Sequence, residues 1–206
     1  GKPNADDSQR PERSKPFPKK ALIFSPHPDD DVISMGGTLM RLVDQGHDVE
    51  VAYQVSGNIA VFDEYALNYL DFVVEFNKNF NLDSLGSQEI FEDVSDYMES
   101  KGNDQYDPEQ LRKLKTLIRR NEAKSACRFS GVKMENVHFM DLPFYETGEI
   151  KKKPWDEEDV QITVDLLRKI KPNQIFVAGD LSDPHGTHRV CLDVFFESMK
   201  QLKDEK

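Results

Sequence analysis

The sequence predicts an α/β fold of three layers, in which a mainly parallel, Rossmann-like sheet is covered by helices on both faces. Short apolar runs alternate along the chain with segments of helical periodicity, and this order is typical of parallel sheets. Two of the apolar runs, 21–24 and 174–178, lead into loops rich in histidine and aspartate. In α/β sheets such loops follow the carboxyl ends of the strands, where ligands bind.

The composition limits the class of protein. The chain has 206 residues, enough for one substantial core, and a net charge of −11 from 38 acidic and 27 basic residues. This charge argues against nucleic acid or an anionic membrane as the main partner. No apolar run approaches the length of a membrane span and no signal peptide is visible, so we expect a cytoplasmic protein. Cys127 and Cys191 fall in separate predicted helices, so we expect buried, reduced thiols.

Residues 1–18 are predicted to be a polar linker or arm, and residues 19–206 the folded domain. The arm holds four prolines and many charged residues with almost nothing apolar, so it cannot bury a core. Such a segment is expected where a domain joins another part of a longer chain.

Strands and helices are predicted in alternation along the domain. The expected strands are 19–25, 48–56, 136–142 and 174–178, and the expected helices are 34–45, 108–130, 155–171 and 189–203. Gly46 and Gly131 follow the first two helices as C-cap residues, and Pro172 prevents continuation of the third.

The interval of about 61–112 is predicted to be a helical insertion. Helical periodicity occurs over 66–76 and 90–98, without a strand signal or a cluster of metal ligands. The interval leaves from a loop at the site-facing edge of the sheet, so it could act as a lid. A structural subdomain or an oligomer contact explains it equally well.

The loop after the first strand carries His27, Asp29, Asp30 and Asp31 within five residues. Imidazole nitrogen and carboxylate oxygen suit Zn²⁺, or another divalent cation. The alternative is an Asp-rich, Pro-stiffened turn that caps the next helix. Consecutive side chains of an extended loop diverge, so Asp29 and Asp30 are expected to point in different directions.

A second loop, after the last predicted strand, carries His185 and His188. These residues are three apart, so they share a face if they lie on the first turn of a helix. Two strand-end loops can meet at one edge of a parallel sheet. His27, Asp30 and His188 would then form a three-ligand metal site with one open position, as in catalytic zinc sites. Exposed or hydrogen-bonded histidines before a helix are the alternative.

These motifs resemble the LmbE/PIG-L family of zinc-dependent N-acetylglucosaminyl deacetylases. The resemblance rests on His-Pro-Asp-Asp at 27–30, Gly-Gly-Thr-Leu at 36–39, an Arg-x-x-Glu helix from Arg119, and His-x-x-His at 185–188. It covers about residues 20–200. The wider context is similar to the module appended to glucosamine-6-phosphate deaminase in some bacterial fusion proteins, which implies a covalently attached deaminase domain.

The resemblance implies a zinc cofactor and an N-acetylated amino sugar as substrate. A carboxylate beside the metal that is not a ligand suits a general base, so Asp29 is assigned this role, in agreement with the family. His185 is assigned as the acid or oxyanion donor. The family match implies that Arg119 points at the substrate, and Asn58 is a further candidate for a substrate contact. A solvated Arg119–Glu122 pair and a plain turn at Asn58 are the alternatives.

Two positions depart from the family's pattern. Asp31 stands where the family usually has Glu, and Gly186-Thr187 stands where it often has Pro-Asp, so Asp183 or Asp29 would have to orient His185. The leading hypothesis is a metal-dependent N-deacetylase of an N-acetylglucosamine derivative. The second is a non-catalytic module that binds an amino-sugar phosphate and regulates an attached deaminase. The sequence does not determine the substrate, the native metal or the oligomeric state.

Overall fold

The sheet has four parallel strands. The structure, a computed structural model, describes residues 18–83, 85–102, 106–147, 152–179, 182, 184 and 186–204, so the predicted arm lies outside it except for Pro18. The strand order is β3-β2-β1-β4. The strands are β1 (Lys20–Ser25), β2 (Asp48–Tyr53), β3 (Val137–Phe139) and β4 (Gln174–Phe176). The mainly parallel sheet predicted from the sequence is confirmed.

The two longest strands form the centre of the sheet. β1 pairs with β2 over six residues, from Lys20–Asp48 to Ser25–Tyr53, and with β4 over three. β2 and β3 end earlier than predicted, at residues 53 and 139. Single backbone hydrogen bonds continue beyond both ends, but Asp141 takes a left-handed φ of 49°, which turns the chain away from regular pairing.

Side-chain alternation along β1 divides the core into two clusters, one on each face of the sheet. Leu22 and Phe24 pack with α5 (Glu157–Ile170) and α6 (Thr187–Asp204). Ile23 packs on the opposite face, with residues of α1 (Asp30–Asp44) and α4 (Glu109–Phe129). The predicted three-layer arrangement is therefore confirmed. Cys127 and Cys191 are buried in opposite layers and are both free thiols.

Helix α1 begins at Asp30, four residues before the predicted start at Ser34. The backbone N–H groups of Val32 and Ile33 donate to the Asp29 carbonyl at 3.1 and 2.9 Å, which closes the first turn. Carboxylates are favourable there because the N-terminus of a helix carries partial positive charge. The regular geometry is interrupted at Met35, just before two glycines of low helix propensity. The expectation that Asp30 and Asp31 lie in an extended loop is therefore wrong, because both residues lie on the first turn of α1.

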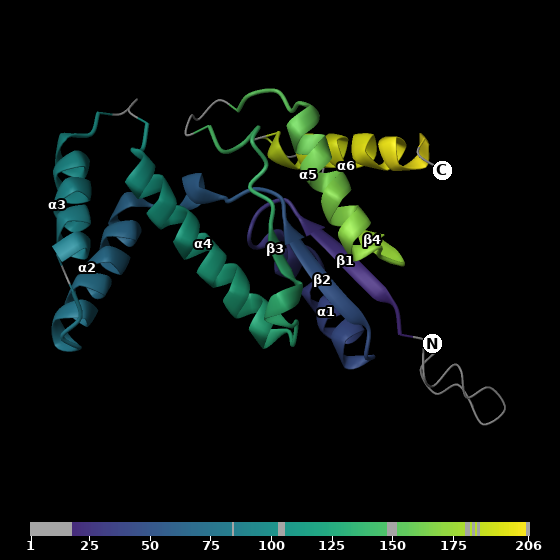
Figure 1. The fold of residues 1–206 in the computed structure, drawn as a ribbon, viewed down its shortest axis with the longest axis horizontal. Coiled ribbons are helices and arrows are strands. Elements are labelled where there is room, and N and C mark those ends of the chain that lie inside the picture. The colour runs from purple at the N-terminus through teal and green to yellow at the C-terminus, as the bar shows by residue number, and fades with distance from the viewer. Residues whose placement is uncertain are drawn as a thin grey trace.

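The interval after β2 is helical, as its periodicity predicted. It starts with the short 3₁₀ turn η2 (Asn58–Ala60) and contains α2 (Asp63–Asn79) and α3 (Leu85–Ser100); a second 3₁₀ turn, η3 (Met134–Asn136), precedes β3. α2 and α3 form a hairpin beside α4 (Figure 1). Apolar residues of the three helices and of the turn before α2 share a small core of their own: Val61, Ala66, Leu70, Val94, Leu111 and Ile118. None of the helices described is long and apolar enough to cross a bilayer.

A network of four charges ties the hairpin to α4. The Lys115 side chain, only 5% exposed, binds carboxylate oxygens of Asp63 and Asp107, each at 2.5 Å. Lys101 binds the same two carboxylates at 2.8 Å. Burial alone would lower the pKa of Lys101, but the hydrogen bonds with Asp107 and Asp63 hold it above its ordinary value. Two cations and two anions therefore balance one another, as groups removed from water require.

We predict that Lys115→Ala lowers the free energy of unfolding by about 3 kcal/mol, because it leaves two partly buried carboxylates with one cation between them. Urea unfolding followed by circular dichroism measures this change. Lys113→Ala is the matched control, because Lys113 lies on the same helix but its side chain and that of its partner Glu109 are 72% and 69% exposed. Its effect should stay below about 0.5 kcal/mol. Equal effects of the two substitutions would contradict a structural role for the network.

Candidate metal centre

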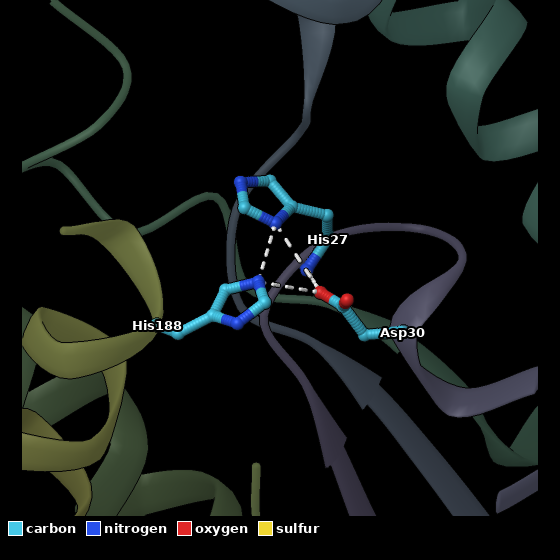
Figure 2. A group of neighbouring side chains, drawn as sticks. All are labelled: His27, Asp30 and His188. Carbon is cyan, nitrogen blue, oxygen red and sulfur yellow. Dashed lines mark hydrogen bonds and ion pairs between the residues drawn. The ribbon is translucent and has the colours of Figure 1, made fainter. Parts of the chain in front are cut away.

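Three side chains from two distant segments converge at the carboxyl edge of the sheet (Figure 2). His27 lies in the loop after β1, Asp30 on the first turn of α1, and His188 on the first turn of α6. His27 Nδ1 lies 3.2 Å from Asp30 Oδ2 and 3.2 Å from His188 Nε2. His188 Nε2 lies 3.1 Å from Asp30 Oδ2. The structure thus brings these three residues together in one triangle of ligand-type atoms.

The triangle has the dimensions of one face of a zinc tetrahedron. The centre of a regular tetrahedron lies at about 0.61 of the edge length from each corner, so these edges give about 1.9–2.0 Å to each ligand atom. Zinc binds imidazole nitrogen at about 2.0–2.1 Å and carboxylate oxygen at about 2.0–2.2 Å. Two nitrogens and one oxygen are also a ligand set that zinc commonly takes. The residues present therefore fit a divalent cation with one position left open.

The Asp30 carboxylate is held in its ligand position by hydrogen bonds. The backbone N–H of His27 donates to Asp30 Oδ2 at 2.8 Å. Burial alone would raise the pKa of Asp30, but hydrogen bonds from the side chain and backbone of His27, with the charge of His188, hold it below its ordinary value. Asp30 is therefore ionised at neutral pH, as a metal ligand must be.

Asp29 points away from the triangle toward α4. Its Oδ2 accepts a hydrogen bond from Arg119 Nη2 at 2.9 Å, and 43% of the Asp29 side chain remains exposed. Arg119 Nη1 donates to Glu122 Oε2 at 2.6 Å. The Arg119–Glu122 pair suggested as the alternative is therefore present, but the same guanidinium also reaches the loop that carries His27. Helix α4 thus faces the candidate centre.

Gly57 permits the close approach of three segments at the site. Its φ is +66°, and a Cβ atom added there would lie 3.0 Å from Pro28 Cδ and 3.4 Å from Arg119 Nε. The same atom would lie 3.8 Å from His27 Cβ. Only glycine combines this backbone conformation with this spacing. The sequence suggested a turn at the neighbouring Asn58 as one of two alternatives, but it contained no sign of the close contact at Gly57.

The segment after β3 contributes Tyr145 and Glu146. The Tyr145 ring meets the His27 ring edge-on, with 5.9 Å between centroids. Glu146 accepts from the Ser56 backbone N–H at 2.8 Å and from the Ser56 hydroxyl at 2.9 Å. Burial raises the pKa of Glu146. Asn58 is 7% exposed and its amide lies 3.4 Å from Glu146 Oε2, so it is directed at this carboxylate. No spacing in the sequence identified Glu146 as part of this site.

Asp31 lies beneath the site, only 2% exposed. Its Oδ2 accepts from the Tyr53 hydroxyl at 2.9 Å, and its backbone N–H donates to Ser25 Oγ at 3.0 Å. The Ser25 hydroxyl lies 2.6 Å from the His27 carbonyl, which connects Asp31 to the metal-site loop. Burial raises the pKa of Asp31, and it raises the pKa of Cys127, beside Tyr53, to about 11. Asp31 therefore anchors the loop and does not join the ligand triangle.

The proposed acid, His185, lies outside the described residues, as does Asp183. Gly186 and Thr187, which replace the family's usual pair, are described. Gly186 takes a φ of +73° and its carbonyl accepts from Val190 N–H at 3.1 Å, so it begins α6. Thr187 is 3% exposed.

The model of the PIG-L family, described as GlcNAc-PI de-N-acetylase, matches residues 22–199. The chain belongs to this family. The resemblance drawn from the motifs at 27–30 and 185–188 is therefore confirmed, and membership of PIG-L supports a deacetylase type of function.

One curated relative and two solved structures are also similar to the chain. It is 54% identical over all 206 residues to a glucosamine-6-phosphate deaminase-like protein of Bacteroides thetaiotaomicron, and spans 31% of that protein's length. N,N′-diacetylchitobiose deacetylase from Pyrococcus horikoshii matches with a TM-score of 0.53 and 23% identity, covering 92% of this chain and 51% of that one. GalB, the 4-carboxy-2-hydroxymuconate hydratase of Pseudomonas putida KT2440, matches with a TM-score of 0.53 and 19% identity, covering 87% and 55%. At these identities the two structures establish the fold, and their names show that it carries different reactions.

We predict that Tyr53→Phe lowers the free energy of unfolding by about 1–3 kcal/mol, because it leaves the buried Asp31 carboxylate without its hydroxyl partner. Chemical denaturation measures the change. Tyr106→Phe is the control for loss of a tyrosine hydroxyl, since Tyr106 is 58% exposed, and its effect should stay within about 0.5 kcal/mol. A Tyr53→Phe protein as stable as this control would show that Asp31 gains nothing from the bond.

Proposed function

We propose that this chain is a metal-dependent hydrolase that removes the acetyl group from an N-acetylglucosamine derivative. The observation that carries the proposal is the convergence of His27, Asp30 and His188 within a chain of the PIG-L family. A deacetylase among the solved structures of the same fold supports the same type of reaction. The relative named as deaminase-like supports a place in amino-sugar metabolism, with a deaminase domain on the same chain.

His27, Asp30 and His188 would hold the cation, with zinc as the first choice and another divalent metal as the second. A bound zinc ion supplies a Lewis acid and makes water a nucleophile near neutral pH. The Asp30 carboxylate offsets part of the cation's charge, and the backbone N–H of His27 keeps it directed at the centre.

Asp29 is assigned as the general base. Its carboxylate belongs to the same loop but lies outside the ligand triangle, where it can accept a proton from the attacking water. Arg119 orients this carboxylate through its 2.9 Å hydrogen bond, and its remaining N–H groups are assigned to the substrate. His185 is assigned to protonate the departing amine, and Asn58 to contact the sugar.

Acetate release is the test of the proposed function. Zinc-loaded protein is incubated with a panel of N-acetylated amino sugars, free and phosphorylated, and acetate is quantified. Release that depends on the metal supports the enzyme. If no sugar releases acetate although the metal is in place and a sugar is bound, the hypothesis of an enzyme is rejected in favour of a non-catalytic binding module.

For the metal, we predict about one divalent ion per chain. His188→Ala should lower the metal affinity by about 100-fold or more, because loss of a group that merely supports a ligand already lowers it by about 10–100-fold. Metal analysis after dialysis against a weak chelator measures it. His47→Ala is the matched control, because His47 precedes β2 at the opposite edge of the sheet, where it accepts from the Lys19 N–H at 3.0 Å. Equal metal content in the two variants would remove His188 from the centre.

For the base, we expect Asp29→Asn to keep its metal while kcat falls by about 10²–10⁴-fold, the usual worth of general-base catalysis. Asp44→Asn, an exposed position near the other end of α1, controls for the change of charge. Parallel loss of metal and activity in Asp29→Asn would make Asp29 a ligand and exchange its role with that of Asp30.

A further inference from the structure

A cavity of about 450 Å³ lies between α4 and the segments that follow β2 and β3. One face of α4 lines it with Arg112, Lys113, Thr116 and Arg120, and Asn58 and Glu146 line the opposite side. Leu117 and the carboxylate Glu109 complete the lining, so three of its eight side chains carry positive charge and two are acidic. The lining therefore carries a small positive excess, although the chain as a whole carries −11.

The three cations differ in how far they are neutralised. Arg120 forms an ion pair with Asp141. Lys113 binds the exposed Glu109, which shares the cavity lining, at 2.5 Å.

Arg112 differs from both. Within the described part of the chain its guanidinium forms no ion pair; its Nε, like that of Arg120, is buried without a hydrogen-bond partner. A buried donor left in this state costs free energy, so its presence is explained when a ligand supplies the acceptor. The unpaired guanidinium borders a cavity large enough to hold that ligand.

The cavity adjoins the candidate metal centre through two pairs of neighbouring residues. Gly57 and Tyr145 lie against His27, and the next residue of each segment, Asn58 and Glu146, lines the cavity. A ligand held at the metal by one end can therefore place another group in the cavity. Glu146 already accepts two hydrogen bonds from Ser56, which hold its carboxylate against that segment, and burial raises its pKa.

We propose that this cavity binds the phosphate of a phosphorylated amino sugar, with Arg112 as its principal ligand; this inference rests on the proposed deacetylase function. The planar fork of a guanidinium matches phosphate oxygens in pairs, and a phosphate monoester carries nearly two charges at neutral pH. The Thr116 hydroxyl and the Asn58 amide supply neutral donors around the same space. Arg112 is the cation of this lining that no described carboxylate pairs with, and a phosphate can supply it with two oxygens at once.

The test compares the affinities of N-acetylglucosamine 6-phosphate and N-acetylglucosamine by calorimetry. All proteins carry Asp29→Asn, so that turnover does not disturb the measurement. Arg112→Gln should lower the preference for the phosphorylated sugar, taken as the ratio of dissociation constants, by about 10- to 100-fold, the worth of a charge-assisted hydrogen-bonded pair. Arg128→Gln, an exposed position on the same helix with the same change of charge, should leave the ratio unchanged.

A ratio unchanged in Arg112→Gln, or lowered equally in Arg128→Gln, overturns the phosphate site. If Arg112→Gln does not fold, Thr116→Val serves instead, with an expected loss of about 2- to 10-fold from one hydrogen bond. Because binding is read without turnover, a failed phosphate site is distinguishable from a failed deacetylase, which shows as absence of acetate release from wild type.

Discussion

The parallel pairing of β1 with β4 is the constraint on which the site depends. Ala21, Leu22 and Ile23 pair with residues 174–176, so the two strands end at the same edge of the sheet. The loops that follow them start side by side, and this brings His27 within 3.2 Å of His188 across 161 residues of sequence. Had the strands been antiparallel, their carboxyl ends would lie at opposite edges and the ligand triangle could not form.

Buried polar groups behind the ligand triangle hold this edge in place. Asp31, Ser25 and Tyr53 form hydrogen bonds beneath the His27 loop, and the N–H and hydroxyl of Ser56 engage Glu146 beside it. Each of these five groups has a hydrogen-bond partner, so its loss of hydration is offset while the loop gains a defined position. The same logic governs the charged network around Lys115, which secures the α2–α3 hairpin against α4 without adding net charge.

The edge offers two kinds of chemistry within one site. The ligand triangle is suited to a divalent cation, whereas the cavity along α4 presents the cationic side chains Arg112, Lys113 and Arg120. Between them lie Gly57, where an added Cβ atom would crowd Pro28 and Arg119, and Tyr145, whose ring meets that of His27. The fold itself does not choose the reaction, because a deacetylase and a hydratase share it. What distinguishes this chain is which side chains its loops place at the edge.

The sequence by itself determined the alternation of strands and helices, the parallel sheet and the candidate ligands. Periodicity is local, and parallel strands bring every strand-end loop to one edge, so His27 and His188 could be paired without coordinates. Only the tertiary structure decided that α1 starts at Asp30, that Gly57 is pressed against its neighbours, and that Arg112 lacks an ion-pair partner among the described residues. These features depend on contacts between segments far apart in sequence, and such contacts follow from side-chain packing, which leaves no periodic trace in the chain.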